Sequence, residues 1–320
     1  MSKLLLSLLS SSSSKKDGFE IELWNSSNQS GITQIMKSMK TKPTDTTQHS
    51  YRSDKSNMFY LEFDGDIQAS GSDKFKQELM ACIQIAKPDD VFLISIESSG
   101  GSVSNYGELY SVIDLIKKKG VCKLWVVVDK IAASGGYLMS LPADRIYANE
   151  FSMIGSIGVL SGVPNVEGLL NKYGIKMEEY TAGERKMNIS MFRDNSEEQK
   201  EYHRNKLVKI HQLFKNQLIK HRGEVIKDLG VDINTLMEGD VWMGDEALRL
   251  GLVDELKSSV EILLDEKERY NIMKINYHNS KDKNGIMNML KPKMLLKKHN
   301  VNKFVGLMMN VMRSNHMNYD

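Results

Sequence analysis

The stretch VVVDKIAASGGYLMS, from Val126 to Ser140, indicates the fold class of this chain. Its three leading valines are typical of a buried β-strand, and the apolar residues after Gly136 are typical of a helix. A short run of small residues, with Ser134 followed by Gly135, joins the two. A strand that passes directly into a helix is the repeating element of α/β folds with parallel strands.

The alternation of strands and helices continues on both sides of this stretch. The sequence SEEQ at 196–199 is a capping box that predicts the start of a long helix, and three lysines before Gly120 predict the end of another. The predicted strands are 57–65, 91–101, 121–128, 145–149, 176–182 and the end of 244–256. The predicted helices are 73–86, 104–120, 135–141, 166–173, 196–223 and the start of 244–256, with a glycine-rich turn at 152–159.

Three segments follow from this pattern. Residues 1–56 are polar and Ser-rich and are predicted to be a low-complexity leader and linker, with a short helix near 31–40. Residues 57–270 carry the alternating pattern and are predicted to be the folded domain. Residues 271–320 are a tail with nine basic residues, two acidic residues and eight methionines. Such a tail suits an interfacial helix or a partner groove, and it equally suits an unstructured basic segment.

Composition excludes some classes of function. A net charge of +2 over 320 residues gives no global field for nucleic acid, so no nucleic-acid partner is expected. Cys82 and Cys122 provide neither a disulfide framework nor paired metal ligands, and no metal or cofactor is expected. No segment has the roughly 20 apolar residues of a spanning helix. The Ser-rich N-terminus is compatible with an organellar transit peptide or a plain leader, so the compartment stays open.

Ser134 is the first candidate for chemistry. A serine hydroxyl attacks a carbonyl only with a base in reach and with donors for the oxyanion that forms. A serine between a strand and a helix is exposed and lies at a helix N-terminus, where free N–H groups favour negative charge. A serine N-cap beside glycines kept for packing explains the same pattern. Gly100 and Gly101, at the end of another predicted strand, could form an anion-binding nest or only a turn.

The base is the second requirement. No histidine lies between His49 and His203, and His203, His211 and His221 fall on or at the end of the long helix, so a Ser-His-Asp triad is poorly supported. A lysine replaces histidine when burial lowers its pKa. Lys186 follows a predicted strand and a glycine and precedes several apolar residues, which could desolvate its amine. An ordinary surface lysine fits the same pattern.

Taken together, the segments resemble a known family. IESSGGSV, VDKIAASGGYLM, MIGSIGV, TAGERK and GLVDEL occur in the order and spacing of the signal peptide peptidase A family of Ser-Lys peptidases, and resemble its short, SohB-type branch. The resemblance covers about residues 57–260. It implies an α/β, ClpP/crotonase-like fold in which ββα units stack into a spiral. It also implies a serine endopeptidase that hydrolyses hydrophobic or membrane-derived, signal-peptide-like substrates through an acyl-enzyme.

The resemblance also implies the roles of individual residues. Ser134 would be the nucleophile and Lys186 the general base. The backbone N–H groups of Gly101 and Gly135 would form the oxyanion hole. Ser156 matches the hydroxyl that orients the lysine amine, although a plain turn serine would look the same. In related single-unit enzymes the serine and lysine come from different subunits, so a homo-oligomer with inter-subunit active sites is expected.

Two features depart from the family pattern. Ser99 precedes the glycine pair where the family usually has proline, which puts the rigidity of the oxyanion loop in doubt. The usual N-terminal membrane anchor is reduced to the apolar run Leu4–Leu9, so only peripheral membrane contact is expected.

Two other functions remain open. A crotonase-type acyl-CoA enzyme shares the oxyanion hole but uses acidic side chains, for which Glu97 and Glu108 are the only candidates near the glycine loops. An inert scaffold of the same fold would bind partners through its basic tail.

Overall fold

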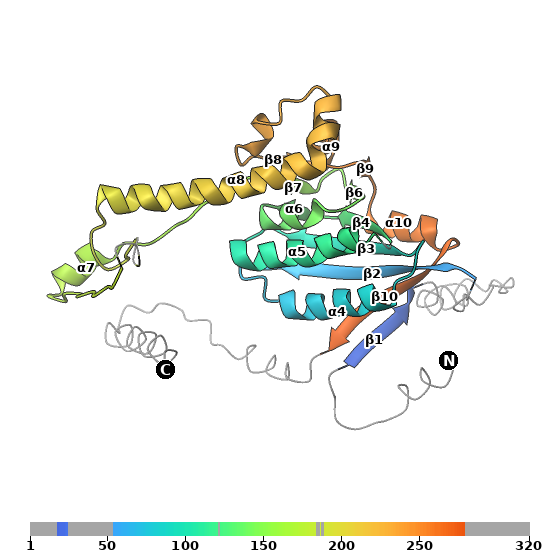
Figure 1. The fold of residues 1–320 in the computed structure, drawn as a ribbon, viewed down its shortest axis with the longest axis horizontal. Coiled ribbons are helices and arrows are strands. Elements are labelled where there is room, and N and C mark those ends of the chain that lie inside the picture. Colours follow the sequence, from blue (N-terminus) through green and yellow to red (C-terminus); the bar gives the residue numbers. More distant parts are fainter. Residues whose placement is uncertain (1–17, 25–53, 121, 184–185, 187–188, 279–320) are drawn as a thin grey trace, which may run out of the picture. The chain divides into compact units, whose positions relative to one another are not determined.

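The computed structural model describes residues 18–24, 54–120, 122–183, 186 and 189–278 (Figure 1). The helix predicted near 31–40 and the tail beyond 278 lie outside them.

One large sheet organises the chain. Its strand order is β1-β10-β2-β3-β4-β6-β9, and every pairing along this path is parallel except that of β1 with β10. A second row, β5-β7-β8, branches from β3 through a single pairing of Ser98 with Ala132. The strand bounds are β1 Gly18–Leu23, β2 Ser56–Gly65, β3 Val91–Ser98, β4 Lys123–Val128, β5 Ile131–Ala133, β6 Arg145–Ala148, β7 Met153–Gly155, β8 Val241–Met243, β9 Glu255–Leu256 and β10 Tyr270–His278.

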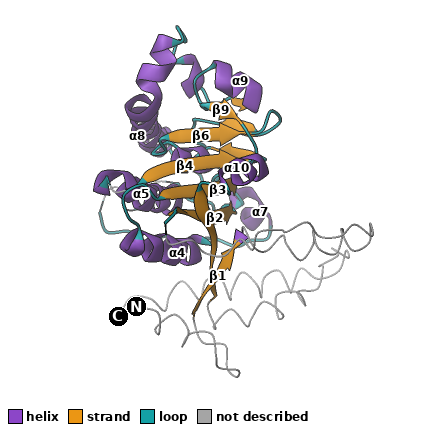
Figure 2. Cartoon of the chain, turned by 90° about the vertical axis from the view of Figure 1, so that its right-hand side faces the viewer, coloured by secondary structure: helices purple, strands orange, loops and turns teal. Residues whose placement is uncertain are grey.

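Helices cover both faces of the large sheet (Figure 2). The main core packs residues of β2, β3 and β4 against α4, α5, α6 and the second half of α8, whereas α10 packs on the opposite face. Because both faces are covered, β3 and β4 are almost continuously apolar rather than alternating. The helix bounds are α4 Ser72–Ile85, α5 Val103–Lys119, α6 Gly135–Ser140, α7 Glu167–Lys172, α8 Glu197–Asp228, the 3-10 helix η1 Thr235–Met237, α9 Gly244–Arg249 and α10 Ser259–Glu266.

The predicted fold class is confirmed. In the segment β4-β5-α6, one strand lies in the large sheet, the next in the second row, and a helix returns to the core. This is the ββα unit that the family resemblance implies. It is also the unit that carries Ser134, between β5 and α6.

Most predicted elements are present, and three predictions are wrong. Residues 176–182 form no strand, and side-chain contacts of Glu179 hold this segment instead. Gly223 does not end α8, because Leu218, Arg222 and Ile226 are buried on one face and carry the helix on to Asp228. The segment 152–159 is not only a turn, because it contains β7.

The sheet also extends beyond the segment 57–270. β1 lies in the predicted leader, and β10 continues to His278 in the predicted tail. The six residues of β1 pair antiparallel with β10 along their whole length. The pairing joins segments about 250 residues apart, so no local pattern marks it. The boundaries of the three segments remain predictions.

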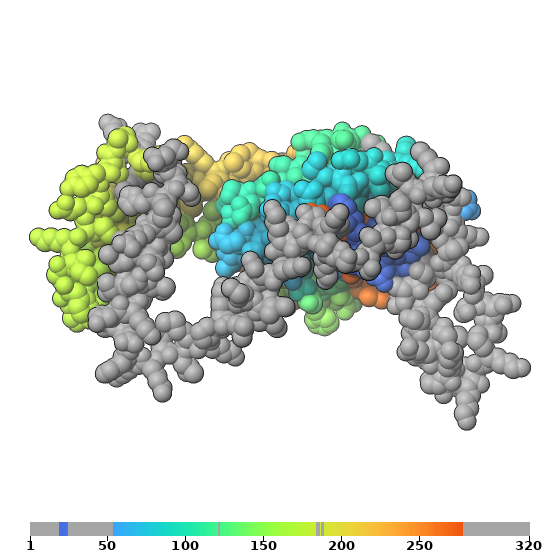
Figure 3. Space-filling view, turned by 90° about the horizontal axis from the view of Figure 1, so that it is seen from below, coloured from blue at the N-terminus to red at the C-terminus, as the bar shows by residue number. Residues whose placement is uncertain are grey.

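Residues 160–213, called the arm below, contribute almost nothing to the core. Ser190 is the one buried residue among those of the arm that the structure describes. α7 has no buried residue, and the buried residues of α8 begin at Phe214. Figure 1 shows α7 beyond the start of α8, on the side away from the sheet. In Figure 3 the yellow-green atoms of this segment lie at the left, apart from the blue and cyan atoms of the first strands and helices.

Candidate active site

Ser134 stands at a strained turn between β5 and α6. Its φ is 51° and its ψ is −120°, a conformation that costs a non-glycine residue about 1–3 kcal/mol. Two backbone bonds hold it there: the Ser134 N–H donates to the Gly155 carbonyl at 2.8 Å, and the Ser134 carbonyl accepts from Leu138 at 2.9 Å. The side chain is half-buried. The turn therefore presents a hydroxyl at the N-terminus of a helix, as the sequence suggested.

The glycine loop after β3 lies directly against this turn. A Cβ added to Gly100 would be 2.6 Å from the Gly135 nitrogen and 2.8 Å from the Ser134 Cβ. Gly135 is the first residue of α6, so its N–H has no acceptor within the helix. Among the described residues, none accepts a hydrogen bond from the N–H of Gly101. Two backbone donors thus remain available on the loops that meet at Ser134.

Ser98 contacts the glycine loop and was not among the residues predicted for the site. Its buried Oγ accepts from the Gly100 N–H at 3.1 Å, donates to the Gly65 carbonyl at 2.9 Å and lies 2.6 Å from the Tyr106 hydroxyl. These contacts join the glycine loop to the end of β2 and to α5. The signal available from sequence was a serine at the end of a buried strand, which is too common to single out.

Ser156 lies beside Ser134 because of the register of two parallel strands. Ala133 pairs with Gly155 at the ends of β5 and β7, and the next residue of each strand is a serine. Both serines have positive φ, 51° and 52°, and they are two of four such non-glycine residues in the described part of the chain. The Ser156 N–H donates to the Asp240 carbonyl at 2.6 Å. A second serine therefore follows the strand next to that of Ser134, one residue past the last strand pair.

Lys186 is not brought to this site within one chain. It belongs to the arm, its side chain is exposed, and its backbone N–H donates to the Gly183 carbonyl at 3.1 Å. No described residue accepts a hydrogen bond from its Nζ. The expected desolvation by the following apolar residues is absent in the single chain.

The other candidate acids and bases are engaged elsewhere. Glu97 accepts two bonds of 2.9 Å from Lys130, and Glu108 accepts one of 2.8 Å from Lys76. These two carboxylates, which an acyl-CoA chemistry would need, are therefore occupied by ion pairs. The three helix histidines contact other groups: His203 the Ser161 hydroxyl, His211 the Ile157 carbonyl and His221 the Tyr110 hydroxyl.

Known proteins match this chain along most of its length. Residues 116–273 match the model of peptidase family S49, and residues 9–111 match the model of the N-terminal part of peptidase family S49. A relative named "Probable protease SohB" from Buchnera aphidicola subsp. Schlechtendalia chinensis is 33% identical over 82% of this chain and 81% of its own length.

Two further relatives carry the same name. The protein from Haemophilus influenzae is 37% identical over 70% of this chain, and that from Buchnera aphidicola subsp. Acyrthosiphon pisum is 37% identical over 71%. The chain spans 61% and 65% of the lengths of these two proteins. Within the part of the chain that the structure describes, no helix is both long and apolar enough to traverse a lipid bilayer.

Proposed function

Because the chain belongs to peptidase family S49, we propose that it is a serine endopeptidase in which Ser134 is the nucleophile and Lys186 of a neighbouring copy is the general base. The observation that carries this proposal is the junction of β5 and α6. There, a strained serine lies beside a glycine loop with free N–H groups and beside a second serine, Ser156.

The reaction uses these groups in two stages. The Ser134 Oγ attacks the carbonyl carbon of the scissile peptide bond while its proton passes to the neutral Lys186 amine. The N–H groups of Gly101 and Gly135 donate to the oxyanion, and the ammonium returns its proton to the leaving amine. Water, deprotonated by Lys186, then hydrolyses the acyl-enzyme. Ser156 accepts from the lysine and aims its lone pair at Ser134.

The exposure of Lys186 favours a base supplied by a second copy. A lysine becomes neutral near physiological pH only when it is desolvated, and the arm does not bury Lys186. The arm also exposes large apolar side chains, which suits a surface that another subunit covers. Leu160 is 91% exposed and Tyr180 is 87% exposed, and the set continues with Val163, Leu169, Tyr173, Ile175, Val208 and Leu213.

We further propose hydrophobic or membrane-derived peptides as substrates. Ile67 contacts the oxyanion loop, because its carbonyl accepts from Ser102 and lies against Gly101, and its side chain is 69% exposed. Val103, at the start of α5, is also exposed. Apolar side chains beside the glycine loop favour apolar residues of a bound peptide.

Labelling with a fluorophosphonate probe tests the proposal. The wild-type oligomer should be labelled at Ser134, and the rate should rise with pH as the lysine amine loses its proton. Ser134→Ala and Lys186→Ala should each abolish labelling. Mixing the two inactive variants should restore it in the assemblies that combine an intact Ser134 with an intact Lys186. Equal labelling of wild type and Lys186→Ala would refute the proposal.

A further inference from the structure

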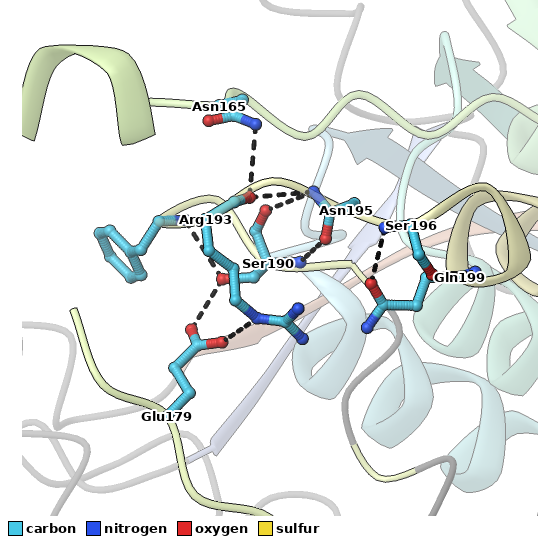
Figure 4. Close-up of polar contacts among 8 residues, drawn as sticks. Asn165, Glu179, Ser190, Arg193, Asn195, Ser196 and Gln199 are labelled. Atoms are coloured by element: carbon cyan, nitrogen blue, oxygen red, sulfur yellow. Dashed lines mark hydrogen bonds and ion pairs between the residues drawn. The ribbon is translucent and has the colours of Figure 1, made fainter. Parts of the chain in front are cut away.

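A polar cluster in the arm ties together the two sides of the segment that carries Lys186. Glu179 lies before Lys186, and Ser190 and Arg193 lie after it. The Ser190 Oγ donates to one carboxylate oxygen of Glu179 at 2.7 Å, and the Arg193 Nε donates to the other at 2.7 Å (Figure 4). The bond from Ser190 to Glu179 joins residues that are eleven positions apart in the sequence. Lys186 is on the loop between them.

The far side of the loop is fixed in turn. Asn195 accepts from the Ser190 N–H at 2.7 Å and donates to the Ser190 carbonyl at 2.8 Å, and Ser196 then caps α8. The carbonyl of Met191 accepts from the N–H of Val166, just before α7. The segment from Ser190 to Ser196 is therefore bonded next to both helices of the arm, and Figure 4 shows its bonds through Asn195 and the cap of α8 at Ser196.

The polar cluster is more buried than an ordinary ion pair on the protein surface. Ser190 is only 4% exposed, although its surroundings in the arm are open to solvent. The Glu179 side chain is 15% exposed, and both of its oxygens accept a charged or buried donor. The bond from Ser190, and then that from Arg193, lower the pKa of Glu179 below its usual value. The carboxylate is therefore charged, and it can bridge both donors at neutral pH.

We propose that Glu179 and Arg193 are positioning residues for Lys186. By tying residue 179 to residues 190 and 193, they limit the conformations of the intervening loop and set how far its amine can reach toward Ser134. This inference rests on the proposed function, since it presumes that Lys186 is the base. The bonds restrict the loop before the substrate binds, so the entropy cost of ordering it is not added to the reaction barrier. Placement matters because displacing a catalytic group by about 1 Å can cost roughly 100-fold in rate.

The test compares Glu179→Gln and Glu179→Ala with a matched control, Glu178→Gln. Glu178 is the adjacent residue, is exposed, and accepts only from the Tyr180 hydroxyl among the described residues. Glutamine at 179 keeps one acceptor, whereas alanine keeps none. Each protein is purified as the full chain, its assembled fraction is isolated by size-exclusion chromatography with light scattering, and fluorophosphonate labelling is followed to completion.

Labelling gives two quantities, the rate constant and the final stoichiometry. We expect a rate constant about 10-fold lower for Glu179→Gln and lower still for Glu179→Ala, with full stoichiometry, while Glu178→Gln stays within about two-fold of wild type. Arg193→Gln should resemble Glu179→Gln. An unchanged rate constant, with or without reduced stoichiometry, would mean that the cluster only helps the arm to fold, and would overturn the inference.

Wild type and Lys186→Ala, measured alongside, separate the two proposals. If wild type is labelled and Lys186→Ala is not, the proposed function stands and the Glu179 variants decide the positioning role alone. If labelling does not depend on Lys186, the proposed function fails, and the positioning role fails with it.

Discussion

The close approach of two backbone segments at Ser134 predicts that Gly100→Ala is damaging. Gly100 has φ +83°, where alanine is strained by roughly 1–2 kcal/mol. Its new Cβ would lie 2.6 Å from the Gly135 nitrogen and 2.8 Å from the Ala133 oxygen, against an ordinary contact of 3.4 Å. The loop must therefore retreat by about 0.6–0.8 Å, and overpacking of this kind costs about 1–3 kcal/mol. We expect a total loss of about 3 kcal/mol in the free energy of unfolding.

The same carbon would cover the N–H of Gly135, so the variant should lose more than stability. On the proposed function this N–H is an oxyanion donor, and the loss of one such donor lowers turnover by roughly 100- to 1,000-fold. Thermal unfolding should show a midpoint lower by roughly 6–12 °C, and labelling should slow at a temperature where the variant is folded. Gly107→Ala is the control, because nothing lies within 4 Å of a Cβ at that helical position. It should be stabilising by about 1 kcal/mol. If Gly100→Ala melts and reacts like wild type, the two loops do not meet as described.

Three further predictions concern buried polar groups. Ser98→Ala removes a hydrogen-bonding partner of the Gly100 N–H and of the Tyr106 hydroxyl. The variant should lower the free energy of unfolding by about 1–3 kcal/mol in urea titrations and should be labelled more slowly. Wild-type stability would contradict this prediction. Arg222→Met removes a buried guanidinium that donates to both carboxylate oxygens of Asp254. The free energy of unfolding should fall by about 3 kcal/mol in the same titrations. A gain in stability would show that the ion pair is dispensable. Burial raises the pKa of Glu78, so the folded state favours its protonated form, and this contribution to stability is present at low pH and is lost as pH rises through the folded pKa. Glu78→Gln should therefore reduce the loss of stability as pH rises above the usual range of a glutamate, and an unchanged pH dependence would refute this assignment.

Local sequence signals predicted the elements whose ends are set by local chemistry. The capping box at Ser196 is present, with Ser196 accepting from Gln199 and Gln199 accepting from Ser196. Gly120 ends α5 with φ +61°, as the lysines before it suggested. The wrong strand at 176–182 illustrates the limit of such signals, because a segment becomes a strand only where a neighbouring strand is free to pair with it.

The candidate site was predicted residue by residue, but its geometry was not. Placing Ser156 beside Ser134 requires the register of β5 and β7, two three-residue strands that no pattern marked. The role of Ser98 depends on its contacts with Gly65, on the neighbouring strand, and with Tyr106, on the following helix, and no local pattern marks either contact. The apolar residues after Lys186 suggested a desolvated amine, yet the structure leaves Lys186 exposed, and Ile189, Met191 and Phe192 are only partly buried.

The separation of Ser134 from Lys186 gives assembly a chemical consequence. On the proposed function, a single chain holds a nucleophile with its oxyanion donors on the sheet and a solvated lysine on the arm. Neither part activates the other while they are apart, because a general base must lie within hydrogen-bond reach of the proton that it takes. Covering the exposed apolar surface of the arm with another copy would desolvate the lysine in the same event that brings it to a serine. Dilution below the assembly concentration should then abolish labelling without unfolding the chain.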